Sequence, residues 1–417
     1  ELTHRPAYSD FVTPTYLDFI RMMMSIAPPG LRHILLVNSG AEALENAIKA
    51  AKLKRPESQF VAAFEGSFHG RTTGALTATY KKLAREGFFT LEWPFVSYPE
   101  RRESESEKDR DAREKSSLRR IFGMMVAGDP KSEGPDREQE KEFRRVLGEV
   151  DAFLGRDASS RGNPHDFLHA LRATVAPEGL ARAKKLTAVI AEPYQGESGM
   201  RFASERFYQR LRMVTALYAV PLILDEVQSG MFLTGTAWAH EQFRLPLPPD
   251  IVASAKKAQM GVVYFNDRYF VSEVSKLNST WGGEPAGATR ALAYARIRED
   301  EQILRRIRRL GAYTLRRLEE MKAGIDREGG AGLVRHVRGK GLALALDFPD
   351  TATRDEVAER ALRRGLILNP AGAKTLRFLP PYDTPTFHID RAVEILSAAI
   401  RDVAKQARPI LLRREFE

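Results

Sequence analysis

The sequence predicts an α/β protein: a large domain with a mainly parallel β-sheet flanked by helices, and a small α+β domain at the C-terminus. Between Leu186 and Leu224, continuous apolar strands and a helical pattern follow one another as strand, helix, strand, which indicates right-handed crossovers and a parallel sheet. Two strands end in a carboxylate, Glu192 and Asp225, at the edge where open α/β sheets present ligand groups. Towards the C-terminus, short strands alternate with helices. We therefore place the large domain at 1–325 and the small one at 326–417.

Composition excludes several classes of site. The 417 residues include no cysteine, which excludes disulfides, thiolate catalysis and cysteine metal ligands; we expect no metal site and a cytoplasmic location. No apolar run approaches the roughly 18–20 residues of a membrane span. The net charge is +10 and the pI about 9.6, but much of this charge lies in mixed-sign helices such as Glu301–Lys322. We therefore expect small-molecule partners, and neither nucleic acid nor a membrane.

The first part of the chain contains a candidate phosphate site. Residues 1–37 are expected to form a loop, a helix at about Pro14–Ala27 and a buried strand at Leu31–Val37. Ser39 and Glu42 then have the S-x-x-E spacing of a capping box. A helix that starts with small residues after a strand exposes backbone N–H groups and the positive end of its dipole, which suits a phosphate. A capped helix without a ligand is the alternative.

Gln59–Thr79 is predicted to form a strand, a glycine-rich turn and the start of a helix. Phe68 and Arg71 lie in the turn. An aromatic side chain there suits stacking on a planar ring, and an arginine suits bidentate binding of a carboxylate. A core phenylalanine with a surface arginine is the alternative.

Residues 100–163 change character. Glu100–Arg120 is dense in charges of both signs, and Asp157–Pro164 is rich in Ser, Gly and Asn. We expect a surface insertion, partly helical and partly disordered, without chemistry.

The rest of the chain continues the α/β pattern and then changes to α+β. The expected helices are Ser204–Tyr218, a long helix from Ala286 to about Lys322 with a break near Gly311, Ala352–Arg364 and Asp390–Gln406. The expected strands are Leu186–Ala191, Val220–Leu224, GVVYF, Leu333–Val337, Leu342–Phe348 and Thr375–Leu379. Ser275–Pro285 is expected to be a turn-rich loop.

Asp225 and Lys256 form a candidate chemical pair. Asp225 ends an apolar strand, and Lys256 follows some thirty residues later, after the turn residues of LPLPPD. Pyridoxal phosphate needs a lysine that forms a Schiff base and a carboxylate that keeps its pyridine nitrogen protonated. A solvated lysine and an unrelated strand-end aspartate are the alternative.

Five motifs occur in one order: SGAEALENAIK, FHGRT, AEPYQGESG, LDEVQSG with the later DIVASAK, and STWGG. Together they resemble the class III, fold-type I pyridoxal-phosphate-dependent aminotransferases, over nearly the whole chain except residues 100–163. Within that class, TGTAWAHEQF, DIVASAKKAQ, SKLNSTWGG and LRFLPP are most similar to the L-lysine 6-aminotransferases. The double lysine and the LNSTWGG loop separate that group from the ornithine and acetylornithine aminotransferases.

The resemblance implies where the cofactor binds. Lys256, six residues after Asp250, is the Schiff-base lysine, with Lys257 as its rival, and Asp225 pairs with the pyridine nitrogen. The other expected contacts are Ser39, Gly40 and Ala41 at the phosphate, Phe68 stacked on the ring with His69 beside it, Gln228 near the phenolate oxygen, and Thr280 at the phosphate of a neighbouring subunit. The last contact implies a homodimer with a shared active site.

The resemblance also implies a substrate site. Arg71 matches the residue that holds the α-carboxylate of 2-oxoglutarate or glutamate. Glu197 and Arg377 match a gate that stays closed when lysine is bound and opens to bind a dicarboxylate. A surface salt bridge worth ~0–1 kcal/mol, or no contact, is the alternative.

The implied reaction is a ping-pong transamination in lysine catabolism. The terminal amino group of L-lysine passes to 2-oxoglutarate, giving 2-aminoadipate 6-semialdehyde and glutamate, with Lys256 as general base and acid. The donor stays open, because one methylene in a pocket is worth only about 1–3 kcal/mol. The alternatives are another class III ω-aminotransferase, for ornithine, acetylornithine or a diamine, and an amino-acid racemase of the same fold.

Two departures from the family bear on activity. Family members carry several dozen residues before the point where this sequence starts, so a truncated, inactive fragment is a further alternative. The charged region is also longer than expected for the group. Against the inactive fragment, Lys256, Asp225, Gln228, Phe68 and Arg71 are all retained.

Overall fold

The computed structural model describes residues 12–157, 159–300 and 302–414; the loop expected at the N-terminus lies largely outside this range. By packing, the chain divides into two compact units. The first comprises the chain up to Pro193, Phe202–Met231 and Trp238–Arg296, and the second comprises Tyr194–Arg201, Phe232–Ala237 and the chain from Ile297 onward. The second unit thus starts earlier than the predicted boundary at residue 325 and takes in two short loops from the first half of the sequence.

The first unit is built on a seven-stranded sheet in the order β1-β9-β8-β7-β4-β2-β3. Its strands are β1 (His33–Val37), β2 (Phe60–Phe64), β3 (Phe95–Val96), β4 (Leu186–Ala191), β7 (Leu222–Asp225), β8 (Ile251–Ser254) and β9 (Gly261–Phe265). β9 is antiparallel to both neighbours, and the other pairs are parallel. The mainly parallel sheet predicted from the apolar strands is therefore confirmed, with one reversed strand.

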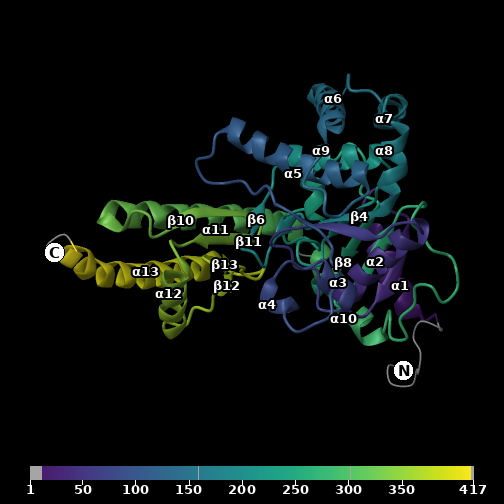
Figure 1. Cartoon of the computed structure of the whole chain (residues 1–417). Coiled ribbons are helices and arrows are strands. Elements are labelled where there is room, and N and C mark those ends of the chain that lie inside the picture. The colour runs from purple at the N-terminus through teal and green to yellow at the C-terminus, as the bar shows by residue number, and fades with distance from the viewer. Residues whose placement is uncertain (1–11, 158, 301, 415–417) are drawn as a thin grey trace. The chain divides into compact units, whose positions relative to one another are not determined.

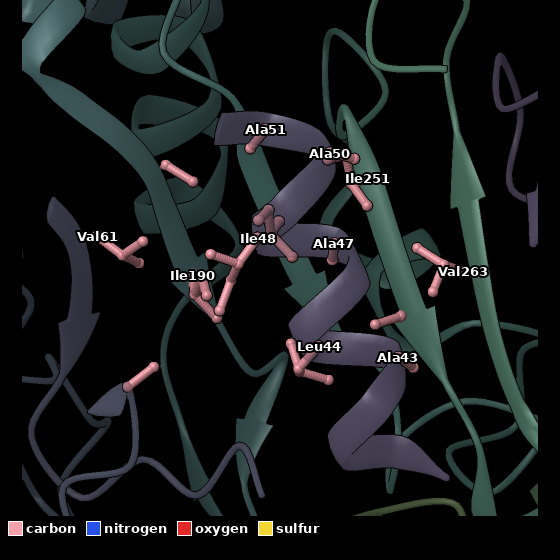
Figure 2. Close-up of a cluster of buried hydrophobic side chains, with 14 of the residues drawn as sticks. Ala43, Leu44, Ala47, Ile48, Ala50, Ala51, Val61, Ile190, Ile251 and Val263 are labelled. Atoms are coloured by element: carbon pink, nitrogen blue, oxygen red, sulfur yellow. The ribbon is translucent and has the colours of Figure 1, made fainter. Parts of the chain in front are cut away.

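Helix α2 (Gly40–Lys54) packs across this sheet (Figure 2). Its buried face is rich in alanine, which lets the helix backbone lie close to the strands. The labelled contacts of this cluster are Ala43, Leu44, Ala47, Ile48, Ala50 and Ala51 on the helix, and Val61, Ile190, Ile251 and Val263 on the strands. Truncating Ile48 to alanine in such a core costs about 2–5 kcal/mol. This packing fixes the N-terminus of α2 relative to the strand ends.

The charged region, expected to be partly helical and partly disordered, contains two long helices, α5 (Glu107–Ala127) and α6 (Arg137–Gly155). Each buries an apolar face, with Leu118, Ile121, Phe122 and Met125 on α5 and Phe143, Val146, Val150 and Phe153 on α6. Arg210 joins both helices, because its guanidinium lies 2.6 Å from Asp111 and 2.6 Å from Asp151. The predicted helical part is confirmed, and Arg210, far away in the sequence, neutralises one carboxylate of each helix.

The remaining helices of the first unit are short, apart from α1, α9 and α10. They are α1 (Pro14–Ser25), α3 (Thr73–Thr77), α4 (Lys82–Arg85), α7 (Pro164–Arg172), α8 (Pro177–Arg182), α9 (Glu205–Leu217) and α10 (Pro285–Asp300), the last of which extends past Arg296, where the first unit ends. The two-residue strands β5 (Tyr194–Gln195) and β6 (Arg201–Phe202) flank the 196–200 loop. In the described part of the chain, no helix is long and apolar enough to cross a bilayer.

The second unit contains a four-stranded antiparallel sheet in the order β10-β11-β13-β12. Its strands are β10 (Arg335–Lys340), β11 (Ala343–Asp347), β12 (Asn369–Ala371) and β13 (Thr375–Phe378), and its helices are α11 (Ile303–Ile325), α12 (Thr351–Arg363) and α13 (Thr386–Arg414). α11 packs against α13 and β10 (Figure 1), so it belongs with this sheet. That packing explains why the unit starts before residue 326.

The long helix predicted to break near Gly311 breaks earlier. α10 ends at Asp300, α11 starts at Ile303, and Gln302 between them has a left-handed φ of 49°. Gly311 lies inside α11, where a Cβ would collide with the carbonyl oxygen of Gly341. This glycine therefore allows α11 to pack closely on the turn between β10 and β11, and the predicted break there was wrong.

Candidate active site

Five parallel strand ends converge on one edge of the large sheet. β1, β2, β4, β7 and β8 run in the same direction, so the segments after them lie along one edge. Ser39, Phe68, Glu192, Asp225 and Lys256 each stand at or within four residues of such an end. Segments separated by more than two hundred residues in the sequence are thus brought to one place.

Asp225 and His69 form a buried pair at this edge. Oδ2 of Asp225 lies 2.7 Å from Nδ1 of His69, and the two side chains are 4% and 0% exposed. The other carboxylate oxygen accepts the N–H of Val227 at 2.9 Å, and the His69 N–H donates to Oγ1 of Thr79 at 2.9 Å. Nε2 of His69 is buried and has no hydrogen-bond partner among the described residues. The pair is therefore held from both sides and leaves one ring nitrogen available.

The N-terminus of α2 presents free backbone donors. Ser39 caps the helix, since its Oγ accepts the N–H of Glu42 at 3.2 Å. The N–H groups of Ser39, Gly40 and Ala41 have no partner within the part of the chain that the structure describes. Three convergent donors at a helix start bind an anion such as a phosphate.

The predicted capping box forms only in half. The Glu42 carboxylate does not return to the N–H of Ser39; its Oε2 accepts the N–H of Asn38 at 3.2 Å and Nδ2 of Asn38 at 2.8 Å. The hydroxyl of Ser279 donates to the same oxygen at 3.2 Å. The loop partner Ser279, remote in sequence, thus helps to hold the carboxylate away from Ser39. This displacement is what leaves the Ser39 N–H free.

Close packing places this helix start beside the Asp225 turn and the lysines. A Cβ on Gly40 would lie 2.7 Å from Cγ1 of Val227 and 3.4 Å from Cβ of Ala255, the residue before Lys256. A Cβ on Gly70 would lie 2.7 Å from Cβ of Ala41. The start of α2, the His69 turn and the lysine segment therefore pack closely together.

The two adjacent lysines differ in their surroundings. Lys256 is exposed and has a left-handed φ of 38°. A backbone held in this region by its surroundings is typical of functional positions. Lys257 is half-buried and donates from Nζ to the carbonyl oxygen of Gln228 at 2.7 Å. Burial and the neighbouring Lys256 ammonium lower the pKa of Lys257 to about 7.

The turn after β2 is fixed by two carboxylates. Oε2 of Glu192 accepts the N–H of Phe68 at 3.2 Å, and Oε1 of Glu45 accepts the N–H of Gly74 at 2.7 Å. Within the turn, the Arg71 guanidinium lies over the Phe68 ring, 5.2 Å from its centroid. Glu45 was not predicted; its place three residues after Glu42, on the next helical turn of α2, was the available signal.

The Ser275–Pro285 loop is anchored at the same helix start. Nδ2 of Asn38 donates to Oγ of Ser279 at 2.5 Å, and a Cβ on Gly282 would collide with the carbonyl of Leu36. Thr280, between these anchors, is exposed. The loop therefore presents Thr280 on the surface of the first unit, close in sequence to the anchor at the start of α2.

Within the second unit, Glu197 and Arg377 are in contact. Nη1 of Arg377 donates to Oε1 of Glu197 at 2.8 Å, and the two side chains are 7% and 32% exposed. Nε of Arg377 is buried and has no partner in the described part of the chain. A mostly buried guanidinium distinguishes this pair from an ordinary surface salt bridge.

Arg338 holds the loop that carries Glu197. Its Nε donates to the carbonyl of Met200 at 3.0 Å, and its Nη2 lies 2.8 Å from Asp347 on β11. Gly372 adds a backbone hydrogen bond to the carbonyl of Glu197 at 2.9 Å. Sequence reasoning missed Arg338, because an isolated arginine on a strand gives no local sign of a partner 138 positions away.

The donor set of the first unit fits pyridoxal phosphate. Free N–H groups at a helix start suit its phosphate, the buried Asp225 carboxylate suits a protonated pyridine nitrogen, and Phe68 offers an aromatic face. Nε2 of His69, which has no hydrogen-bond partner among the described residues, can form a further hydrogen bond at the same place. By contrast, no cluster of three or more metal-ligating side chains occurs among the described residues.

Comparison with known proteins agrees with this chemistry. The family model described as "Aminotransferase class-III" matches residues 5–129 and 138–400. These stretches include residues 100–129 and 138–163 of the charged region. L-lysine-epsilon aminotransferase of Mycobacterium tuberculosis is 30% identical over 418 residues, which cover 95% of this chain and 79% of that protein.

Two further relatives illustrate the range. The solved structure of lysine aminotransferase from M. tuberculosis in the internal aldimine form has a TM-score of 0.77 and 29% identity, and the match covers 95% of this chain and 82% of that one. A probable mitochondrial 4-aminobutyrate aminotransferase of Caenorhabditis elegans is 26% identical, over 96% of this chain and 77% of that protein.

Proposed function

Since the chain belongs to the class III aminotransferases, enzymes that use pyridoxal phosphate, we propose that it transfers the terminal amino group of L-lysine to 2-oxoglutarate. The products are 2-aminoadipate 6-semialdehyde and glutamate. The observation that carries the substrate assignment is the mostly buried Glu197–Arg377 pair, because a site that takes a cationic and then an anionic substrate needs an arginine whose charge can be covered. The names of the mycobacterial relatives support the same donor.

Asp225 holds the proton on the pyridine nitrogen, and His69 keeps its carboxylate in place. When bound, pyridoxal phosphate supplies a carbonyl that accepts an amine and a ring that withdraws electrons from the reacting carbon. The N–H groups of Ser39, Gly40 and Ala41 bind the phosphate, Phe68 covers one face of the ring, and the Gln228 amide binds near the phenolate oxygen. These assignments are supported by the buried Asp225–His69 pair and the free donors at α2.

Lys256 binds the cofactor and moves the proton at the reacting carbon. Lys257 already donates its amine to Gln228, whereas the Lys256 side chain is exposed and follows a backbone in a left-handed conformation. The lowered pKa of Lys257 is the feature that favours the rival assignment, since reactive lysines are activated in this way. We assign Lys256 because its amine, unlike that of Lys257, has no hydrogen bond or ion pair with a described residue that would first have to break.

Two arginines bind the carboxylates of the substrates. Arg71, supported by its stacking over Phe68, holds the α-carboxylate of glutamate or 2-oxoglutarate. Glu197 covers Arg377 while lysine is the substrate and leaves it when a dicarboxylate enters, so that Arg377 binds the distal carboxylate.

We further propose a cytoplasmic homodimer in which Thr280 reaches the phosphate site of the partner. Support comes from the exposed Thr280 on a loop that is anchored at the phosphate-binding turn through Ser279 and Asn38. Trp281 beside it is 52% exposed, as expected for a large apolar side chain that a partner covers.

An absorbance titration tests the substrate pair. The purified protein with pyridoxal phosphate should lose its visible cofactor band on addition of L-lysine and recover it on addition of 2-oxoglutarate, with glutamate formed. 4-Aminobutyrate and ornithine are the comparison donors. Loss of the band with one of these and not with lysine would replace the donor while leaving the family chemistry intact; amino-acid isomerisation without 2-oxoglutarate would indicate the racemase.

A further inference from the structure

Helix α11 carries an unusual concentration of positive charge. Between Ile303 and Leu318 the sequence contains six arginines and no aspartate or glutamate. Elsewhere in the second unit arginines pair with carboxylates, as at Arg338, Arg360, Arg364, Arg391 and Arg401. Arg305 and Arg309 instead form no ion pair with any residue that the structure describes. This difference marks one face of α11 as a place where positive charge is left uncompensated by the protein.

These arginines line a cavity. A hollow of about 730 Å³ is bordered by Arg305, Arg306, Arg309, Arg316 and Tyr313 of α11 and by residues 383–386 at the start of α13. All of these residues belong to the second unit, and none has been given a role in the cofactor or substrate sites. The hollow is open to solvent, and Arg305, Arg309 and Arg316 are exposed, so a ligand can reach their guanidinium groups directly. The cavity is therefore a separate candidate site.

The charges at the start of α11 interact unfavourably with the helix dipole. Arg305 lies in the first turn, no acidic residue lies there, and Gln302 makes no side-chain cap. Cations at a helix N-terminus and like charges four residues apart, as at Arg305 and Arg309, both destabilise a helix. An anion bound between them would remove both unfavourable interactions.

The surrounding side chains are held in place for such a ligand. Tyr313 donates its hydroxyl to Asp390 at 2.7 Å, and that hydrogen bond raises the pKa of Tyr313, so the phenol stays protonated. The Arg316 guanidinium lies 5.6 Å from the Tyr313 ring centroid. Thr384 and Thr386 contribute hydroxyls to the lining, and Asp383 contributes a carboxylate.

We propose that this arginine pocket binds a small phosphorylated compound carrying at least two negative charges. Guanidinium groups bind phosphate oxygens through paired N–H donors, and Arg305 and Arg309, one helical turn apart, can contact two phosphates of one ligand. The proposal does not rest on the substrate assignment, because it uses neither the cofactor site nor the Glu197–Arg377 pair.

Calorimetry on the pyridoxal-phosphate-loaded enzyme tests the proposal, with inorganic pyrophosphate and ATP as probes at constant ionic strength. We expect one site per chain that is lost or weakened at least ten-fold in the Arg305→Gln/Arg309→Gln variant. The matched control is Arg391→Gln/Arg401→Gln, which removes the same charge from paired positions of the same unit and should bind as the unmodified protein does. Asp383→Asn should bind more tightly, since it removes a carboxylate from the lining.

Several results would overturn the proposal. These are absence of binding at millimolar pyrophosphate, equal weakening in both double variants, or displacement by equimolar sulfate. Tighter binding of citrate than of pyrophosphate would make the ligand a polycarboxylate, and tighter binding of a single-stranded oligonucleotide would make the surface a nucleic-acid site; either would refute a phosphorylated small molecule. Thermal unfolding and the cofactor absorbance of each variant establish that it is folded and loaded.

Discussion

Oδ2 of Asp225 lies 2.7 Å from Nδ1 of His69, and both side chains are buried. The pair joins the end of β7 to the turn after β2, 156 positions apart in sequence. It fixes the direction of the carboxylate that we propose binds the pyridine nitrogen.

Asp225→Ala should lower kcat by at least about 10²-fold, because the ring nitrogen loses the group that keeps it protonated. This magnitude follows from the roughly 10²–10⁴-fold that acid–base and electrostatic groups typically contribute to catalysis. His69→Ala should have a smaller effect on kcat and should raise the dissociation constant of pyridoxal phosphate. Steady-state kinetics measure kcat, and a cofactor fluorescence titration measures the dissociation constant of pyridoxal phosphate. Thr79→Val is the control. It removes the hydroxyl that accepts the backbone N–H of His69 and donates to the carbonyls of Gly70 and Ala75, without touching the Asp225–His69 contact; equal losses in all three variants would indicate general disruption of the turn.

Glu42 should control cofactor affinity through the phosphate-binding turn. Glu42→Ala removes the acceptor shared by Asn38 and Ser279, and a hydrogen bond to a charged group is worth about 1.5–3 kcal/mol. We expect roughly ten-fold or greater weakening of pyridoxal phosphate binding, measured by equilibrium dialysis. Glu42→Gln keeps an acceptor and removes a negative charge near the phosphate, so its affinity should be retained or improved. If Glu42→Gln weakens binding as much as Glu42→Ala, the carboxylate does not act by positioning the turn.

Chemical labelling can determine which lysine binds the cofactor. Borohydride reduction of the loaded enzyme followed by peptide mapping should place the pyridoxyl group on Lys256. Lys256→Ala should abolish labelling and turnover, whereas Lys257→Met should retain labelling. A label on Lys257 in the unmodified protein would reverse the assignment.

Lys257 should make stability depend on pH in the alkaline range. Its pKa is lowered from 10.5 to about 7 in the folded protein, so between these values the unfolded chain binds more protons than the folded one. The free energy of unfolding should therefore rise as pH increases from about 7 to about 10. Urea unfolding at several pH values measures this slope, and Lys257→Met should flatten it. Lys184→Met, a change on the 3₁₀ turn before β4, is the surface control. An unchanged slope in Lys257→Met would show that other groups cause the dependence.

Glu197 and Arg377 should separate the two half-reactions. Arg377→Gln removes the guanidinium, so KM for 2-oxoglutarate should rise about 10–100-fold while the reaction with lysine is largely kept. Glu197→Ala leaves the arginine uncovered, so the reaction with lysine should be impaired more than that with 2-oxoglutarate. Stopped-flow spectra of each half-reaction measure the split. Since removing one partner of a buried pair also costs about 3–5 kcal/mol, thermal unfolding is measured alongside, and parallel losses in both half-reactions would contradict the gate.

Much of the fold could be predicted from local pattern. Apolar strands such as Leu186–Ala191, the S-x-x-E spacing at Ser39 and the order of the motifs were sufficient for the sheet, the capped start of α2 and the family. These features depend on side-chain periodicity and on hydrogen bonds between residues a few positions apart. Both can be recognised from the sequence without knowledge of the tertiary structure.

Tertiary structure decided the remaining points. Glu42 accepts a hydrogen bond from Ser279, and Arg210 forms ion pairs with Asp111 of α5 and Asp151 of α6. Gly311 packs on Gly341 where a helix break was expected. Each of these depends on groups that are brought together by folding across long sequence separations. Charge or helix propensity alone does not specify such partners, because the energy of a polar contact depends on its geometry and burial, which the completed packing determines.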